Sequence, residues 1–187
     1  MRFYEGTAMD RKEFIRKTLF SGAVCACGMG MATIPNALGQ EASKPEDPQE
    51  GFRREWIRTF LANLDSGLDE SLRVRFMEAC GRDCAKRGAT RMVEPFKGNV
   101  DGFVAAMSGH LGKDNVRREG GLVTLQYPEC YCPMVSKIKD KISDTWCICS
   151  KGWVLEMFGI AAGKPVEVKL VQSIKRGDPV CRFEIMV

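Results

Sequence analysis

Apolar residues recur at three- and four-residue steps in three stretches of the chain, which is the spacing of amphipathic helices. The first stretch begins near Trp56 and ends at the break around Gly67. The second is predicted to run from about Leu68 to Arg87, and the third from about Val100 to Leu111. The predicted apolar stripe of the second helix consists of residues four apart: Leu72, Phe76, Cys80 and Cys84.

Near the C-terminus the pattern changes to strict alternation of apolar and polar residues, which predicts a β-hairpin. Its apolar face combines residues before and after a turn at 175–179: Val166, Val168, Leu170, Cys181, Phe183, Ile185 and Val187. A strand over Leu122–Tyr127 and a helix from about Lys151 to Ala162 precede the hairpin. The predicted fold class is therefore α+β, with N-terminal helices packed on a small antiparallel sheet that ends in a C-terminal β-hairpin.

The first residues of the chain have the three parts of an export signal. A basic run around Arg11-Lys12 precedes an uncharged stretch at 18–34, and small residues follow at 35–39. The basic pair with Phe14 and Ile15 resembles a twin-arginine translocation signal in which lysine replaces the second arginine. We therefore expect an export signal over residues 1–39, a polar linker over 40–54, and a cysteine-rich α+β domain over 55–187.

Such a signal implies the export machinery as a partner, and a periplasmic or extracellular location once the signal is cleaved. The uncharged stretch of about 17 residues is at the lower limit for a membrane span. A retained signal would therefore anchor the protein in the membrane, and the sequence leaves the two outcomes open.

Charge and composition narrow the classes of function. The formal net charge is only +4, and no dense basic stripe with interleaved aromatic residues is present, so nucleic-acid binding is not expected. Nine cysteines are unusual for 187 residues, and a single histidine, His110, excludes most histidine-rich metal sites. The sequence contains neither a phosphate-binding glycine loop nor a nucleotide fingerprint.

Six of the seven cysteines behind the signal form three pairs along the chain: Cys80 with Cys84, Cys130 with Cys132, and Cys147 with Cys149. Residues four apart share a helix face, and residues two apart share a face of an extended chain, so each pair can direct two thiols to one point. Clusters of thiolates suit zinc, copper(I) and iron–sulfur centres. These six cysteines are the candidate metal ligands, with zinc as the expected metal and copper or an iron–sulfur cluster as alternatives.

Disulfide bonds explain the same pairs equally well, because cysteines usually oxidise in the compartments that exported proteins enter. The sequence does not choose among the many connectivities that six cysteines allow. Cys181 is different, since it lies on the apolar face of the last predicted strand. We interpret it as a small core residue.

The C-terminal third also resembles a known family. The segments CICSKGW (147–153), GKPVEV (163–168) and KRGDPVCRF (175–183) resemble the end of the 4-vinyl-reductase (hydrocarbon-binding) domain. The segment CGRDC (80–84) resembles a helix of the related 2-amino-thiazoline-4-carboxylate hydrolase-like proteins. The resemblance covers only part of the chain. It implies an α+β fold that binds a small molecule, often with a cysteine-bound zinc.

Three functions follow as hypotheses. A binding module would hold a metal or cluster beside a small-molecule pocket, with Trp153 next to the ligand. A thiazoline-type hydrolase acting on C–N bonds would use Cys80 or Cys84 as nucleophile, with His110 as a base and Arg82 favouring the thiolate. A plain secreted domain would be stapled by disulfides. A homodimer is compatible with each of the three.

Overall fold

The computed structural model describes residues 47–187, and its centre is a four-stranded antiparallel sheet with the order β1-β2-β4-β3. The strands are β1 (Val116–Glu119), β2 (Leu122–Tyr127), β3 (Glu167–Gln172) and β4 (Cys181–Met186). The two outer pairings, β1 with β2 and β3 with β4, flank the pairing of β2 with β4. The predicted α+β class with a C-terminal hairpin is confirmed.

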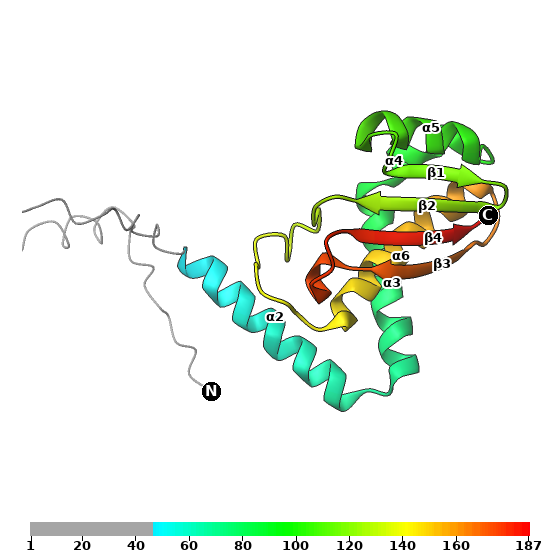
Figure 1. The fold of residues 1–187 in the computed structure, drawn as a ribbon. Coiled ribbons are helices and arrows are strands. Elements are labelled where there is room, and N and C mark those ends of the chain that lie inside the picture. Colours follow the sequence, from blue (N-terminus) through cyan, green and yellow to red (C-terminus); the bar gives the residue numbers. More distant parts are fainter. Residues whose placement is uncertain (1–46) are drawn as a thin grey trace, which may run out of the picture. The chain divides into compact units, whose positions relative to one another are not determined.

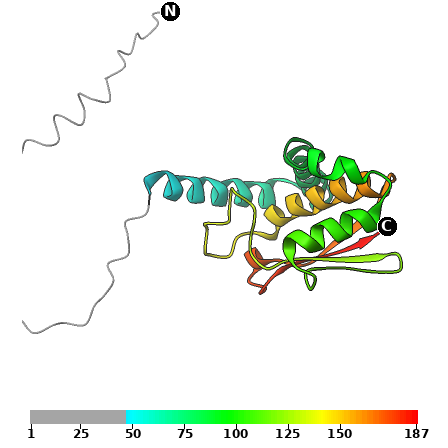
Figure 2. The same ribbon diagram turned by 90° about the horizontal axis from the view of Figure 1, so that it is seen from above.

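The helices of the described region lie mainly on one side of this sheet (Figures 1 and 2). They are α2 (Pro48–Gly67), α3 (Glu70–Gly88), α4 (Thr90–Val93), α5 (Val100–Leu111) and α6 (Asp144–Ala162), with short 3₁₀ turns η1 (Glu94–Phe96) and η2 (Ile174–Arg176). Helix α6 packs against the sheet, and α3 packs on the far side of α6. The order of layers is therefore sheet, α6, α3.

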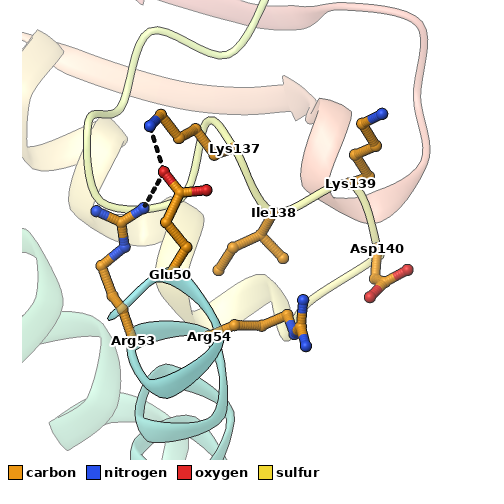
Figure 3. Close-up of a pocket in the computed structure, with 7 residues that line it drawn as sticks. All are labelled: Glu50, Arg53, Arg54, Lys137, Ile138, Lys139 and Asp140. Carbon is orange, nitrogen blue, oxygen red and sulfur yellow. Dashed lines mark hydrogen bonds and ion pairs between the residues drawn. The ribbon is translucent and has the colours of Figure 1, made fainter. Parts of the chain in front are cut away.

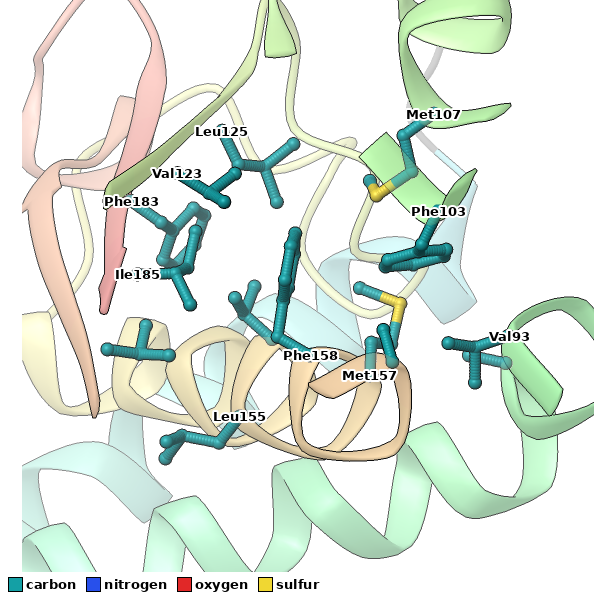
Figure 4. Close-up of a cluster of buried hydrophobic side chains, with 14 of the residues drawn as sticks. Val93, Phe103, Met107, Val123, Leu125, Leu155, Met157, Phe158, Phe183 and Ile185 are labelled. Carbon is teal, nitrogen blue, oxygen red and sulfur yellow. The ribbon is translucent and has the colours of Figure 1, made fainter. Parts of the chain in front are cut away.

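The main hydrophobic core lies between α6 and the sheet (Figure 4). Phe158 of α6 is fully buried and meets Phe103 of α5 edge to face, with ring centroids 5.2 Å apart. From the sheet, Leu125 of β2 and Phe183 of β4 are fully buried in the same cluster. Burying each side chain of this size contributes about 1.5–3 kcal/mol, so α6 is fixed on the sheet by its apolar residues.

Two glycines allow α3 and α6 to touch through their backbones. A Cβ atom on Gly81 would lie 1.9 Å from the carbonyl oxygen of Cys149, and a Cβ on Gly152 would lie 2.2 Å from that of Glu78. Two ion pairs flank this contact, Arg82 with Glu156 at 3.3 Å and Lys151 with Glu78 at 2.5 Å. Only glycine fits at these two positions, since any side chain would push the helices apart.

Several elements have the bounds that the sequence predicts. Helix α5 covers Val100–Leu111 and buries Phe103 and Met107, as its periodicity indicates. Strand β2 covers Leu122–Tyr127, and β3 and β4 form the predicted hairpin. In these segments the apolar period is strong and the ends carry clear turn or cap residues.

The apolar stripe predicted on the second helix is wrong. Leu72 and Phe76 are 43% and 47% exposed, and Cys80 and Cys84 are also exposed. The buried face of α3 lies one position further along the chain, at Met77, Gly81 and Ala85. The physical reason is the close contact with α6, which selects small residues over large apolar ones.

Two predicted boundaries differ from the structure, and one strand was not predicted. Helix α2 begins at Pro48, because Asp47 caps it and proline is well suited to a first helical turn, so residues 48–54 are helical and not a linker. Helix α6 begins at Asp144, seven residues before the predicted start, with Ser143 as its N-cap. Strand β1 was not expected, since it has one apolar residue among charged ones.

The predicted export signal at 1–39 lies outside the described residues. Between residues 47 and 187, no helix has the length and apolar character required to cross a bilayer.

Candidate thiol site

The early start of α6 changes the geometry of the last cysteine pair. Cys147 and Cys149 lie on a helix, where residues two apart point in widely different directions. Cys147 is buried and its Sγ lies 2.9 Å from the hydroxyl of Ser173, whereas Cys149 lies at the contact with α3. The expectation that this pair directs both thiols to one point is therefore wrong.

The structure instead sorts the cysteines into two groups, which we call the outer and the inner thiol group. All seven are free thiols in the part of the chain that the structure describes. The outer group consists of Cys80, Cys84, Cys132 and Cys149. The inner group consists of Cys130, Cys147 and Cys181. The two groups adjoin each other, because Cys132 also acts on Cys130 and Cys147 also acts on Cys149.

Cys149 is the centre of the outer group. Its backbone touches Gly81, which lies between Cys80 and Cys84 on α3. Burial raises the pKa of the Cys149 thiol to about 12, and four nearby thiols add to this effect, in the order Cys132, Cys84, Cys80 and Cys147. Cys80 and Cys84 are exposed, whereas Cys132 and Cys149 are partly buried. The group therefore reaches from the α3–α6 contact to the surface of α3.

The inner group surrounds the start of η2. Burial raises the pKa of the Cys147 thiol to about 11, although its hydrogen bond with Ser173 counteracts the rise and the thiols of Cys181 and Cys130 add to it. Cys181 accepts a hydrogen bond from the N–H of Ile174 at 3.5 Å. Its side chain packs against the main core, in agreement with the predicted core role.

A buried lysine beside the inner group could not be anticipated from the sequence. Lys175 is only 4% exposed, and its ammonium group donates a hydrogen bond to the carbonyl oxygen of Ile138. Across residues 47–187, no carboxylate lies within ion-pair distance of this group. Its charge counteracts the effect of burial, which raises the pKa of the Cys130 thiol. Lys175 thus places a positive charge near the thiol of Cys130.

The outer thiol group has the ligand type that the predicted metal requires. Four thiols within one group suit zinc or another soft ion chemically. In the described region, however, no three Cys, His, Asp or Glu side chains already converge as a metal site does. The outer group is therefore a suitable set of ligands that is not arranged around a single point.

The other predicted site residues lie apart from one another. His110 is exposed in the last turn of α5 and forms no hydrogen bond or ion pair with the described residues. Arg82 is paired with Glu156, so its charge is partly neutralised. The Trp153 ring packs against Gly88 of α3 and against the main core, so its role in the described structure is packing.

Comparison with known proteins shows the family of the chain. The model of DUF6144, a family of unknown function, matches residues 36–187. The chain belongs to this family. The matched range includes both thiol groups of this DUF6144 protein and all of its described residues. No curated protein matches the sequence.

Among solved structures, the DUF6144 protein is similar to the phenol-responsive sensory domain of the transcription activator PoxR, determined with phenol. The sequence identity is 14% and the TM-score is 0.34. The match covers 74% of this chain and 72% of the sensory domain.

The burial of the thiols predicts an order of chemical reactivity. With its pKa at about 11, only about one Cys147 side chain in a thousand is a thiolate at pH 8. In the reduced, metal-free protein, Cys80 and Cys84 should therefore react with iodoacetamide at least about tenfold faster than Cys147. Time-resolved alkylation followed by peptide mass spectrometry measures the rates, and equal rates at the three positions would contradict the described burial.

Proposed function

We propose that this DUF6144 domain binds a soft metal ion, with zinc as the expected metal, through the thiolates of Cys80, Cys84, Cys132 and Cys149. The observation that carries the proposal is the backbone contact between Gly81 and Cys149, because it brings one cysteine of α6 beside a pair of cysteines on α3. Cys80 and Cys84 are one helical turn apart, so both thiols lie on one face of α3.

The environment of these thiols supports a soft cation as the ligand. A thiol whose pKa is raised by burial and by neighbouring thiols stays protonated in the free protein. A bound zinc ion supplies the positive charge that lets such cysteines deprotonate, and affinity for it rises with pH as protons are released. Rotation of the cysteine side chains about χ1 is the adjustment required, since staggered rotamers move Sγ while the helices stay in place.

Zinc titration of the full chain, reduced and metal-free, tests the proposal. A chromophoric chelator competes for the metal and reports the affinity. Cys149→Ser should weaken zinc binding at least about tenfold, since one of four ligands is lost. Cys181→Ser is the matched control, because it also replaces a partly buried cysteine but lies in the inner group. Its zinc affinity should equal that of the wild type.

Two results would contradict the proposal. One is equal zinc affinity of the wild type and Cys149→Ser. The other is a disulfide between cysteines of the outer group in protein taken directly from cells, seen by non-reducing mass spectrometry, which would favour the disulfide-stapled interpretation. The resemblance to the 4-vinyl-reductase domain, which often carries a cysteine-bound zinc, agrees with the proposal but does not replace this test.

A further inference from the structure

Two apolar stripes, one on α2 and one on α3, are exposed in the part of the chain that the structure describes. On α2, Phe52 and Trp56 lie about one turn apart and are 74% and 53% exposed. On α3, Leu72 and Phe76 lie about one turn apart and are almost half exposed. A four-residue repeat of large apolar side chains is the pattern of a buried helix face. We call these four side chains the exposed apolar face.

The two stripes lie on the same side of the molecule. Helices α2 and α3 leave the turn at 68–69 in diverging directions, like the arms of a V (Figure 1). On α2, the Trp56 ring stacks on Phe60 with centroids 5.3 Å apart, and Phe60 packs into a second, smaller hydrophobic cluster together with Cys132. On α3, the next residue of the stripe is Cys80, which shares the outer thiol group with Cys132. Both stripes therefore border the outer thiol group.

The charged side of α2 already has partners within the chain. Glu50 accepts a hydrogen bond from the ammonium group of Lys137 and lies 3.9 Å from the guanidinium group of Arg53 (Figure 3). Further along the helix, Arg58 is paired at 2.7 Å with Asp140. These contacts hold α2 on the loop before α6. They leave the apolar stripe as the side of α2 that the described residues do not cover.

We propose that a second copy of this chain packs on the exposed apolar face, so that α2 and α3 of the two copies form a four-helix interface. Such a contact is isologous, which requires a surface that is complementary to itself. An apolar face whose neighbouring charges are paired meets this requirement. On α3, Arg73 lies 3.7 Å from Asp65, and Arg75 acts on the carboxylate of Asp69. A face that binds lipid would instead combine apolar residues with unpaired cations.

The exposed area matches what a stable dimer requires. A fully buried aromatic side chain removes about 150–250 Å² from water, so the four side chains offer roughly 450 Å² at their observed exposures. A standard interface buries about 800 Å² on each partner, and about 65% of that area is apolar in homodimers. The exposed apolar face therefore supplies most of the roughly 500 Å² of apolar area that each partner contributes.

Analytical ultracentrifugation of the full chain, reduced and metal-free, tests the proposal. At tens of micromolar the mass should be twice that of one chain. Phe76→Glu and Trp56→Glu should each raise the dissociation constant at least about thirtyfold, because each buries a charge at the contact. Met186→Glu is the matched control, since this methionine is as exposed as Trp56 but lies at the end of β4, and its dissociation constant should equal that of the wild type. Circular dichroism should show the same helix content in all variants.

A protein that stays monomeric overturns the proposal, and so does a dimer that both Phe76→Glu and Trp56→Glu leave intact. A dimer that forms only with zinc would also overturn it, because the metal would then join the two copies. Binding of a monomeric protein to phosphatidylcholine vesicles, lost in Phe76→Glu, would assign the face to a lipid surface instead. Cys149→Ser should dimerise like the wild type, so this test is separate from that of the zinc site.

Discussion

Replacing Gly81 with alanine is expected to destabilise the domain by at least about 3 kcal/mol, a large value for adding one methyl group. The added Cβ would lie 1.9 Å from the carbonyl oxygen of Cys149 and 2.9 Å from the backbone nitrogen of Trp153. Both neighbours are backbone atoms of α6, which cannot rotate away as the end of a side chain can. Helices α3 and α6 would therefore have to separate along their whole contact.

Denaturant unfolding followed by circular dichroism measures this effect, with Gly109→Ala as the matched control. Gly109 also lies in a helix, but nothing is within 4 Å of the position of its Cβ. Alanine there should leave stability unchanged or raise it by up to about 1 kcal/mol, because alanine favours helix more than glycine does. A Gly81→Ala variant as stable as the wild type would show that α3 and α6 are further apart than described.

Alkaline pH is expected to remove about 3 kcal/mol of stability through Cys147 alone. Burial raises the pKa of this thiol from its ordinary value of 9.0 to about 11 in the folded protein. Between these two values the unfolded chain releases the proton and the folded chain keeps it, so the contribution is complete below pH 9 and is lost as pH rises through 11. Two pKa units correspond to about 2.7 kcal/mol.

The comparison of the metal-free wild type with Cys147→Ala isolates this contribution, because other groups also titrate in this range. The difference in the free energy of unfolding between the two proteins should shrink by about 2–3 kcal/mol from pH 8 to pH 11. A difference that stays constant over this range would mean that Cys147 is accessible to water in the folded protein.

How far the sequence predicts the fold depends on what each side chain packs against. Helix α5 and the C-terminal hairpin are predicted well, because their apolar residues face one large core and keep a regular period. Helix α3 fails for the opposite reason, since its buried face is made by Met77, Gly81 and Ala85. A glycine within a helix usually lowers the stability of that helix. Only the structure of the partner helix α6 shows that Gly81 allows the backbones of α3 and α6 to touch.

The sequence predicted which cysteines form the candidate site, but it did not predict which of them lie near one another. The cysteines found in the outer group were all candidates, yet pairing by sequence distance joined Cys147 to Cys149, which point to different neighbours. Ser143 followed by Asp144 is a helix N-cap signal that could have revealed the early start of α6. No signal in the sequence indicates that Lys175 is buried, because the turn that contains it reads as an exposed one.

The central claim is that cysteines from α3, α6 and the loop before α6 share one metal ion. X-ray absorption at the zinc edge, on the full chain loaded with one equivalent of zinc, tests it most directly. We expect a first shell of sulfur only, with about four atoms at about 2.3 Å, and the loss of one sulfur in Cys149→Ser. A shell of nitrogen and oxygen atoms, or a sulfur count that Cys149→Ser leaves unchanged, would contradict the claim.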